Sequence, residues 1–268
     1  MSEVARVLQP LSDWLAGGGG LIFLTDFDGT LAPMVSDPGD VELPSHVRAH
    51  LGTLARSPSI RMGIISGRDL RDLRTQVGVS EAIYAGCHGL EIEGPGIAFR
   101  HPEAVAQEEE INAIAEELGQ RAESVPGMRV EPKRLGVAIH YRHVAPETMR
   151  HVEMELARAI QRCGSRLKIF HGTKVIEVLP QVAWHKGHCA AWIRDHVQGA
   201  LGRPALTLYM GDEWTDEHAF ETLAGQAITV RIGDQAPVSR AEYRLGSVAE
   251  VHDLLAALAD QAAARGTP

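Results

Sequence analysis

Two aspartates, Asp26 and Asp28, stand one residue apart at the end of the apolar run LIFLTDF. Aspartate disfavours strands, and two like charges so close together repel each other. Carboxylate oxygens are, however, the ligands that Mg²⁺ prefers in proteins. A carboxylate can also attack a phosphoryl group, while a second carboxylate transfers the proton. The pair therefore indicates a cation site and raises the hypothesis of phosphoryl chemistry.

Polar residues stand at three further places, each after an apolar strand or at the start of a helix. They are Ser66, Gly67 and Arg68 in IISGR, Lys186 in WHKGH, and Asp212, Glu213, Asp216 and Glu217 in MGDEWTDE. Each group alone has an ordinary interpretation as a helix cap, a solvated lysine or an acidic helix start. Because ligands of an open parallel sheet bind beyond the carboxyl ends of its strands, the four groups together predict one site. There, Ser66 and Lys186 would hold phosphoryl oxygens, and the aspartates would hold Mg²⁺.

The elements that must position these residues alternate along the chain. Apolar strand-like runs (LIFLTDF, SIRMGIIS and AIYAGC) are separated by helical patterns at residues 44–56 and 69–77. From residue 182 the alternation returns, with a helix at 186–197, the run ALTLYMGD, a helix at 216–224 and the run AITVRIG. Near-continuous apolar strands between helices are typical of a parallel sheet covered on both faces. We therefore predict an α/β fold with a doubly wound, Rossmann-like parallel-sheet core of residues 1–94 and 181–268.

The pattern between residues 95 and 180 is different. A helix-strand-strand order occurs twice there, with the strands MRVEPKR, LGVAIHYRH, RLKIFHG and KVIEVLP. This order predicts an inserted α+β domain with an antiparallel sheet. An insertion into a surface loop costs little loop-closure entropy, so an interrupted core is physically ordinary. The linkers near residues 94–96 and 179–182 are the predicted hinges of this insert.

Composition excludes several classes of partner. The formal net charge is −9, no basic run offsets it, and aromatic residues make up 5% of the chain. Nucleic acid and anionic membrane surfaces are therefore unsuitable partners. Cys87, Cys163 and Cys189 are odd in number and far apart, which favours a reducing compartment. Without a signal-peptide pattern or an apolar run of roughly 18 residues, the sequence predicts a cytoplasmic protein with no membrane span.

Four motifs, DFDGTL, ISGR, HKG and GDEWTDE, occur in this order. They resemble the motifs of the haloacid dehalogenase superfamily of phosphatases, and the insert between the second and third motifs resembles a C2-type cap. Over nearly its whole length the chain resembles the trehalose-6-phosphate phosphatase family, through AGCHGLEI, VEPKRLGVAIHYR, GTKVIEVLP and the form of the last motif. The resemblance implies Mg²⁺-dependent hydrolysis of the phosphosugar trehalose 6-phosphate through an aspartyl-phosphate, with trehalose-6-phosphate synthase as a functional partner. It also implies that the cap closes over the sugar.

The resemblance implies a role for each residue that matches a motif. Asp26 is the implied nucleophile and a metal ligand, and Asp28 is the implied general acid and base, with its main-chain carbonyl on the metal. Asp212 is the third implied metal ligand. Asp216 is implied to support the metal or its bound water without coordinating the metal directly. The implied catalytic set is Asp26, Asp28, Ser66 and Lys186. The implied substrate contacts are Gly29, Thr30, Gly67, Arg68, His88, Gly89, Glu131, Lys133, Arg142 and Glu177.

Alternatives stay open at this point. The same core and cap could act on another phosphosugar, such as sucrose 6-phosphate or a glycosyl-phosphoglycerate. The chain could instead be a non-catalytic phosphosugar-binding subunit of a trehalose-synthesising complex, although such a subunit has no need of a nucleophile. The histidine pairs in HYRH and HKGH could suggest zinc, but neither has a further ligand at a suitable spacing. Glu213 stands where many relatives carry a second aspartate, and it is left outside the predicted metal ligands.

Overall fold

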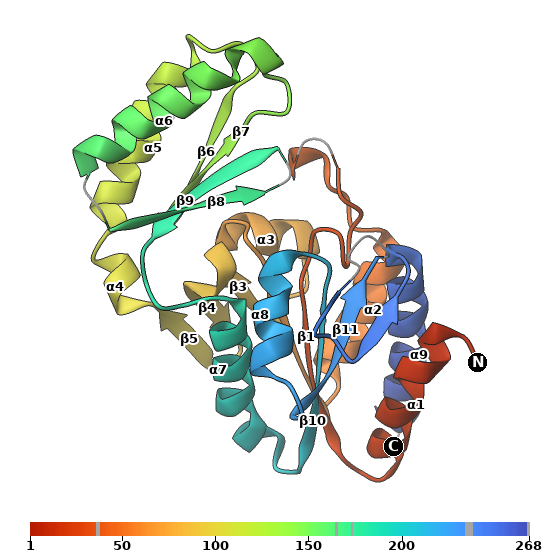
Figure 1. The fold of residues 1–268 in the computed structure, drawn as a ribbon. Coiled ribbons are helices and arrows are strands. Elements are labelled where there is room, and N and C mark those ends of the chain that lie inside the picture. Colours follow the sequence, from red (N-terminus) through yellow and green to blue (C-terminus); the bar gives the residue numbers. More distant parts are fainter. Residues whose placement is uncertain (36–37, 164–165, 173, 234–237, 267–268) are drawn as a thin grey trace. The chain divides into compact units, whose positions relative to one another are not determined.

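The computed structural model describes residues 1–35, 38–163, 166–172, 174–233 and 238–266 (Figure 1). The chain forms two compact units, one of Met1–Phe99 with Trp184–Pro268 and one of Arg100–Ala183. In the described part of the chain, no helix is long and apolar enough to cross a membrane. All four sequence motifs belong to the first unit.

The first unit is built on an eight-stranded sheet with the order β12-β11-β10-β1-β2-β3-β4-β5. Its strands are β1 (Gly20–Thr25), β2 (Ile60–Ile65), β3 (Ile83–Gly86), β4 (Glu91–Gly94), β5 (Ile97–Arg100), β10 (Ala205–Gly211), β11 (Ala227–Ile232) and β12 (Tyr243–Leu245). The strands from β12 to β3 are parallel, and β4 pairs with β3 in the antiparallel direction. The predicted α/β core with a mainly parallel sheet is confirmed.

Helices lie on both faces of this sheet (Figure 1). They are α1 (Glu3–Ala16), α2 (Ser45–Arg56), α3 (Leu70–Val77), α7 (Lys186–Gln198), α8 (Trp214–Thr222) and α9 (Val248–Gly266). In β1, Leu21 and Phe23 belong to the core shared with α1, α2 and α9, whereas Ile22 and Leu24 belong to the core shared with α7 and α8. Every residue of β1 is buried, which is why its sequence is continuously apolar instead of alternating.

An antiparallel edge extends the first unit beyond residue 94. β4 and β5 are neighbours in the sheet, and the turn between them includes Gly96, whose φ is +74°. The predicted hinge at residues 94–96 therefore joins two strands of one sheet. At the return crossing, the Trp184 Nε1 donates a hydrogen bond to the Gly89 carbonyl (2.9 Å), and the indole stacks on Phe99 at 5.1 Å. The chain accordingly passes from the first unit to the second between residues 99 and 100 and returns between residues 183 and 184. The predicted boundaries were between residues 94 and 95 and between residues 180 and 181.

The second unit is a four-stranded antiparallel sheet with the order β6-β7-β9-β8 and helices on one face. Its elements are α4 (Pro102–Val105), α5 (Glu108–Ala122), β6 (Arg129–Lys133), β7 (Gly136–His140), α6 (Met149–Cys163), β8 (Leu167–Gly172) and β9 (Val175–Pro180). Its core is formed by Val137, Ile139, Ile176 and Val178 of the sheet with Ile114 and Leu118 of α5 and Val152 and Leu156 of α6. Because successive strand residues point to opposite faces, the polar residues that alternate with them lie on the face away from the helices. The α+β insert is confirmed.

Candidate active site

Asp26 and Asp212 follow two neighbouring parallel strands, at the point where each strand ends. Thr25 of β1 pairs with Met210 of β10, and the Asp26 N–H donates to the Met210 carbonyl at 2.9 Å. The Oδ1 atom of Asp26 accepts a hydrogen bond from the Phe27 N–H at 2.7 Å, which orients the carboxylate. The two strands therefore bring both aspartates to the carboxyl edge of the sheet, where an open parallel sheet binds its ligands.

The turn after Asp28 is shaped around the carboxylate of Asp212. Gly29 has a φ of +79°, and a Cβ atom added to it would lie 2.1 Å from the Oδ2 atom of Asp212. The Thr30 hydroxyl donates a hydrogen bond to Asp212 Oδ1 at 3.0 Å. Any side chain at residue 29 would therefore displace this carboxylate. Gly29 and Thr30, both predicted to contact substrate, position Asp212 in this structure.

Asp216 is held by the start of α8 and by the end of β10. Its carboxylate accepts the N–H of the N-cap residue Glu213 at 3.0 Å within a capping box, and the residue is fully buried. The Tyr209 hydroxyl donates to Asp216 Oδ1 at 2.7 Å. A Cβ atom on Gly211 would lie 2.2 Å from the carboxyl carbon of Asp216, so this close approach requires glycine. Asp216 is thus fixed beside the end of β10.

Lys186 begins α7 and places its ammonium group between two of these carboxylates. Its Nζ lies 2.9 Å from Asp26 Oδ2 and 2.9 Å from Asp216 Oδ1, and its side chain is 2% exposed. The preceding residue, His185, is the N-cap of the helix, and its Nδ1 accepts the Gly187 N–H at 3.1 Å. This cap fixes the first turn of α7 and with it the direction of the lysine. The ordinary interpretation of Lys186 as a solvated lysine is therefore wrong.

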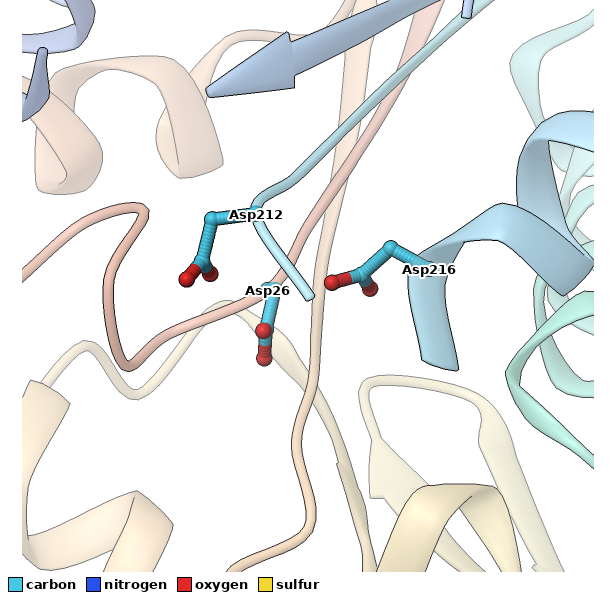
Figure 2. Close-up of side chains that lie close together, drawn as sticks. All are labelled: Asp26, Asp212 and Asp216. Atoms are coloured by element: carbon cyan, nitrogen blue, oxygen red, sulfur yellow. The ribbon is translucent and has the colours of Figure 1, made fainter. Parts of the chain in front are cut away.

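Asp26, Asp212 and Asp216 form a candidate cation site. Figure 2 shows their side chains, which come from the ends of two strands and from the first turn of a helix. Each residue offers one carboxylate oxygen, and these three oxygens lie within 4.8 Å of one another. Hard oxygen donors of this kind are the ligands that Mg²⁺ and Ca²⁺ take. Asp28, expected to use only its main-chain carbonyl, contributes no carboxylate to the group.

The cluster carries more negative charge than one buried lysine can offset. Burial, together with Asp216 and Asp212, raises the pKa of Asp26 well above its ordinary value in spite of Lys186. Burial, Asp216 and Glu213 raise the pKa of Asp212 to about 7. Burial alone would lower the pKa of Lys186, but Asp216 and Asp26 outweigh it and raise the pKa. A divalent cation would supply the missing positive charge, so the residues present fit one.

The carboxylate of Asp28 lies on Arg68 instead of in the cluster. Arg68 donates to it through Nε at 2.6 Å and through Nη2 at 2.7 Å, while Nη1 donates to Asp72 at 2.7 Å. The Arg68 side chain is 7% exposed, and its guanidinium lies over the Phe27 ring at 5.3 Å. A bidentate pair of this kind is strong and directional. Arg68, a predicted substrate contact, therefore holds the predicted acid and base in this structure.

Ser66 follows β2 and is buried beside a strained loop. Its hydroxyl accepts the Arg68 N–H at 3.2 Å across Gly67, and its carbonyl accepts the His88 N–H at 2.9 Å. His88 has a φ of 57°, in the left-handed region that non-glycine residues rarely occupy, and Gly89 follows at +91°. Strain of this kind is found where a backbone is held for function. The structure thus places His88 and Gly89 next to the second motif.

The predicted contacts of the second unit form a separate polar group on the sheet face away from the helices. The Lys133 ammonium donates a hydrogen bond to the Glu177 carboxylate. Strand register places Glu131 and Glu177 on either side of Ala138, so they share one face. Arg142 lies just beyond β7 and is exposed. The structure therefore brings three of these residues together and leaves Arg142 at the margin of the sheet.

Two residues of these groups were not predicted, His140 and Tyr209. His140 Nε2 lies 2.7 Å from Glu131 Oε2, and His140 and Lys133 lower the pKa of Glu131 although burial would raise it. The period-two alternation along β7 is the signal that could have placed His140 with Glu131. Tyr209, which donates to Asp216, lies in a continuously buried part of β10 and carries no such signal.

Comparison with known proteins adds evidence of a different kind. A family model described as trehalose-phosphatase matches residues 24–246. The trehalose-phosphate phosphatase of Mycobacterium marinum is 36% identical over 99% of this chain and 68% of its own length. A solved trehalose-6-phosphate phosphatase related protein superimposes with a TM-score of 0.78 at 21% identity, covering 92% of this chain and 100% of its own. The C-terminal domain of trehalose-6-phosphate phosphatase from C. albicans gives 0.72 at 21% identity, with coverages of 94% and 96%. These two structures show a shared fold.

Proposed function

The chain belongs to the trehalose-phosphatase family of phosphoric monoester hydrolases, and we propose that it converts trehalose 6-phosphate and water to trehalose and phosphate. One observation carries the chemistry. The Lys186 ammonium lies between Asp26 and Asp216 at the carboxyl edge of the sheet, with Asp212 beside them. A binding subunit would have no use for so much buried charge, since burying carboxylates against one another is unfavourable. The arrangement therefore supports catalysis over the alternative of a non-catalytic subunit.

In this proposal Asp26 is the nucleophile. The Phe27 N–H and Lys186 each contact one of its oxygens, so the carboxylate is oriented before substrate arrives. An oxygen of Asp26 forms a bond to phosphorus as the bond from phosphorus to the sugar oxygen breaks. Water then attacks the aspartyl-phosphate, which releases phosphate and restores Asp26. Ser66 and Lys186 hold the phosphoryl oxygens during both steps.

Asp28 moves the proton in both steps. It gives a proton to the departing sugar oxygen and takes one from the attacking water. In this structure its carboxylate accepts two hydrogen bonds from Arg68, and an oxygen that accepts from a guanidinium is not a proton donor. Asp28 must therefore leave Arg68 before it protonates the sugar. Arg68 accordingly acts by positioning Asp28 between turnovers.

Mg²⁺ is the proposed cofactor. Asp26, Asp212 and the main-chain carbonyl of Asp28 would hold it, with Asp216 in support. When bound, it would offset the negative charge of the carboxylates and polarise a phosphoryl oxygen. The raised pKa values of Asp26 and Asp212 support this assignment, because burial and neighbouring carboxylates disfavour the charged forms and a divalent cation would favour them.

The polar group of the second unit supplies the proposed sugar contacts. Glu131, Lys133 and Glu177 offer carboxylate acceptors and an ammonium donor that suit the hydroxyl groups of a disaccharide. Arg142 and His88 are further proposed contacts. The substrate must come from a reaction that forms a phosphorylated disaccharide, so a trehalose-6-phosphate synthase is the proposed functional partner.

Phosphate release from a phosphosugar panel tests the proposed function. With MgCl2 present, we expect kcat/KM for trehalose 6-phosphate to exceed that for glucose 6-phosphate and sucrose 6-phosphate by about 100-fold or more, since a site that pairs with hydroxyl groups rejects analogues that leave its polar groups unpaired. The Asp26→Asn variant, purified in parallel, measures any contaminating phosphatase. Equal values for glucose 6-phosphate and trehalose 6-phosphate would overturn the disaccharide assignment.

Thermal unfolding at two pH values tests the cation site without measuring activity. The pKa of Asp212 is raised from 3.8 to about 7, so the folded chain binds this proton more tightly than the unfolded chain. This group's contribution to the free energy of unfolding therefore falls as pH rises from about 4 to 7 in the metal-free protein. Mg²⁺ replaces the proton, so we expect MgCl2 at 10 times its Kd at pH 8 to raise Tm by roughly 3 °C at pH 8, and the same concentration to raise Tm by less than about 1 °C at pH 5.

Asp212→Asn and Asp195→Asn are the matched variants for that experiment. Asp195 is an exposed residue of α7 that lies outside the carboxylate cluster. Asp212→Asn should lose the Mg²⁺-dependent rise at pH 8, whereas Asp195→Asn should keep it. A rise of equal size at both pH values, or one that survives Asp212→Asn, would rule out this cluster as the site.

A further inference from the structure

A tryptophan stands between two of the carboxylates that form the candidate cation site. Trp214 lies two positions after Asp212 and two positions before Asp216, and it is the first residue of α8. The residue is 46% exposed. A single exposed apolar residue is ordinary on a protein surface. What distinguishes Trp214 is its place in the loop that carries two members of the carboxylate cluster.

The side chain of Trp214 projects toward the carboxyl edge of the sheet. α8 follows β10 and begins at that edge, directly after Asp212 and Glu213. In an α-helix the Cα–Cβ bonds tilt toward the N-terminus, so the side chain of the first residue extends toward the start of the helix. The indole therefore lies on the side of α8 where Lys186 and Ser66 would hold the phosphoryl group of the proposed substrate.

The backbone next to Trp214 is held in place by hydrogen bonds. The preceding residue, Glu213, donates its N–H to Asp216 Oδ2 at 3.0 Å. Its carbonyl accepts the Asp216 N–H at 3.1 Å and Arg231 Nη1 at 2.9 Å. Trp214 thus belongs to the same fixed turn as Asp216, and a group on a fixed backbone loses little conformational entropy when it binds a ligand.

Three imidazole rings connect the indole of Trp214 with the start of α7. The His218 ring, one turn further along α8, meets the indole in a T-shaped contact at 5.6 Å. His218 stacks on His185 at 4.6 Å, and His185 stacks on His188 at 3.9 Å. The stack therefore joins Trp214 to the N-cap and first turn of α7, the helix that begins with Lys186.

Close packing of the two helices holds this stack. A Cβ atom on Gly187 of α7 would lie 2.4 Å from the carbonyl oxygen of His218 and 2.3 Å from Thr222 Oγ1 of α8. The ring of His185 is oriented by its cap, because its Nδ1 accepts the Gly187 N–H at 3.1 Å. The rings that contact the indole are thus positioned by both helices, and the exposed indole of Trp214 is a preorganised surface.

We propose that Trp214 is a specificity residue that stacks on a sugar ring of the phosphosugar, an inference that rests on the proposed function. A group esterified to the phosphate must extend from Lys186 into the space beside the carboxylate cluster. One face of a pyranose ring carries C–H groups with partial positive charge, and the face of an indole carries partial negative charge. The contact also removes apolar indole surface from water. Small-molecule sites commonly combine such aromatic surfaces with a few polar groups.

Steady-state kinetics of two Trp214 variants test the inference. Trp214→Ala removes the ring, and we expect it to raise KM for trehalose 6-phosphate about 10-fold while kcat changes less than about threefold, because the stack forms in the ground state and the transition state alike. Trp214→Phe keeps an aromatic face and should hold KM within about threefold of wild type. Acetyl phosphate has no sugar ring, so its kcat/KM should change less than about twofold in either variant.

Trp14→Ala is the matched control for loss of an exposed indole. Trp14 is 39% exposed, and its Nε1 donates a hydrogen bond to the carbonyl of Gly20, the first residue of β1. It therefore lies at the amino edge of the sheet, opposite the carboxylate cluster. Trp14→Ala should leave KM for both substrates unchanged within about twofold. The midpoint of thermal unfolding establishes that each variant is folded at the assay temperature.

Tryptophan emission supplies a readout without turnover. In the Asp26→Asn chain, trehalose 6-phosphate with MgCl2 should change the emission, and adding Trp214→Phe should remove most of that change. An emission change that survives Trp214→Phe, or an unchanged KM in folded Trp214→Ala, would overturn the inference and leave the proposed function standing. Equal losses on acetyl phosphate and trehalose 6-phosphate would overturn it as well, since they indicate a structural role. A wild-type chain that hydrolyses acetyl phosphate but not trehalose 6-phosphate would overturn the proposed function and this inference together.

Discussion

Asp26→Asn is expected to lower kcat for trehalose 6-phosphate by about 10⁴-fold or more, because the amide cannot attack phosphorus. The fold should persist. Burial and the neighbouring carboxylates raise the pKa of Asp26, which means that the charged form is disfavoured where it lies. Replacing it by a neutral residue of the same size therefore relieves repulsion in the metal-free protein. Steady-state phosphate release and the midpoint of thermal unfolding measure the two effects.

Asp40→Asn is the control for this variant, since Asp40 is exposed and lies outside the cluster. It should keep wild-type turnover. A second readout is the intermediate itself, because wild-type enzyme quenched during turnover should carry a phosphoryl group that hydroxylamine removes. An Asp26→Asn variant that retains more than about a tenth of wild-type kcat would refute the covalent mechanism.

Lys186→Gln is expected to lower kcat by about 10³-fold and to destabilise the metal-free protein by about 3 kcal/mol at pH 8. The ammonium is 2% exposed and lies 2.9 Å from both Asp26 and Asp216. Removing the ammonium leaves Asp26 and Asp216 buried without a positive partner. Unpaired buried charges destabilise the folded state more than a buried pair does. The pKa of Asp26 is already raised, so at pH 5 this residue can take up a proton and the destabilisation should be smaller. Chemical denaturation at the two pH values measures the difference.

Lys174→Gln is the matched control, because Lys174 is an exposed lysine that lies outside the carboxylate cluster. It should change the free energy of unfolding by less than about 0.5 kcal/mol. A Lys186→Gln protein as stable as wild type at pH 8 would show that the Lys186 ammonium does not stabilise the buried carboxylates of Asp26 and Asp216. Unchanged turnover in the same variant would remove Lys186 from the phosphate-binding set.

The order of elements and the place of the main carboxylates follow from local pattern. Each strand of a parallel sheet is buried on both faces, so β1 appears in the sequence as a continuous apolar run. Asp26 and Asp212 come directly after such runs, and this position alone predicts that they meet at one edge of the sheet. The sheet of the inserted unit has only one face packed on helices, so its strands alternate between apolar and polar residues. This change of pattern identifies the inserted unit in the sequence.

The partners of individual side chains depend on register and packing, which local pattern does not encode. The ion pair between Asp28 and Arg68 joins residues 40 positions apart. In the sequence, an arginine that pairs with Asp28 looks the same as an arginine that binds substrate. Arg68 was therefore predicted to contact substrate. The predicted domain boundary at residue 94 precedes the boundary after Phe99 in the structure, because β4 and β5 pair with the core sheet. Strands of four residues are too short to reveal such pairing by periodicity.

The sequence by itself determined the fold class, the inserted unit and the strand ends that carry Asp26 and Asp212, because apolar periodicity and motif position are properties of neighbouring residues. Only the tertiary structure decided that Lys186 lies between Asp26 and Asp216, and that Gly29 must lack a side chain to admit Asp212. It also decided that His218 of α8 stacks on His185 of α7. These arrangements arise where separate elements pack, and their geometry exists only once the chain has folded.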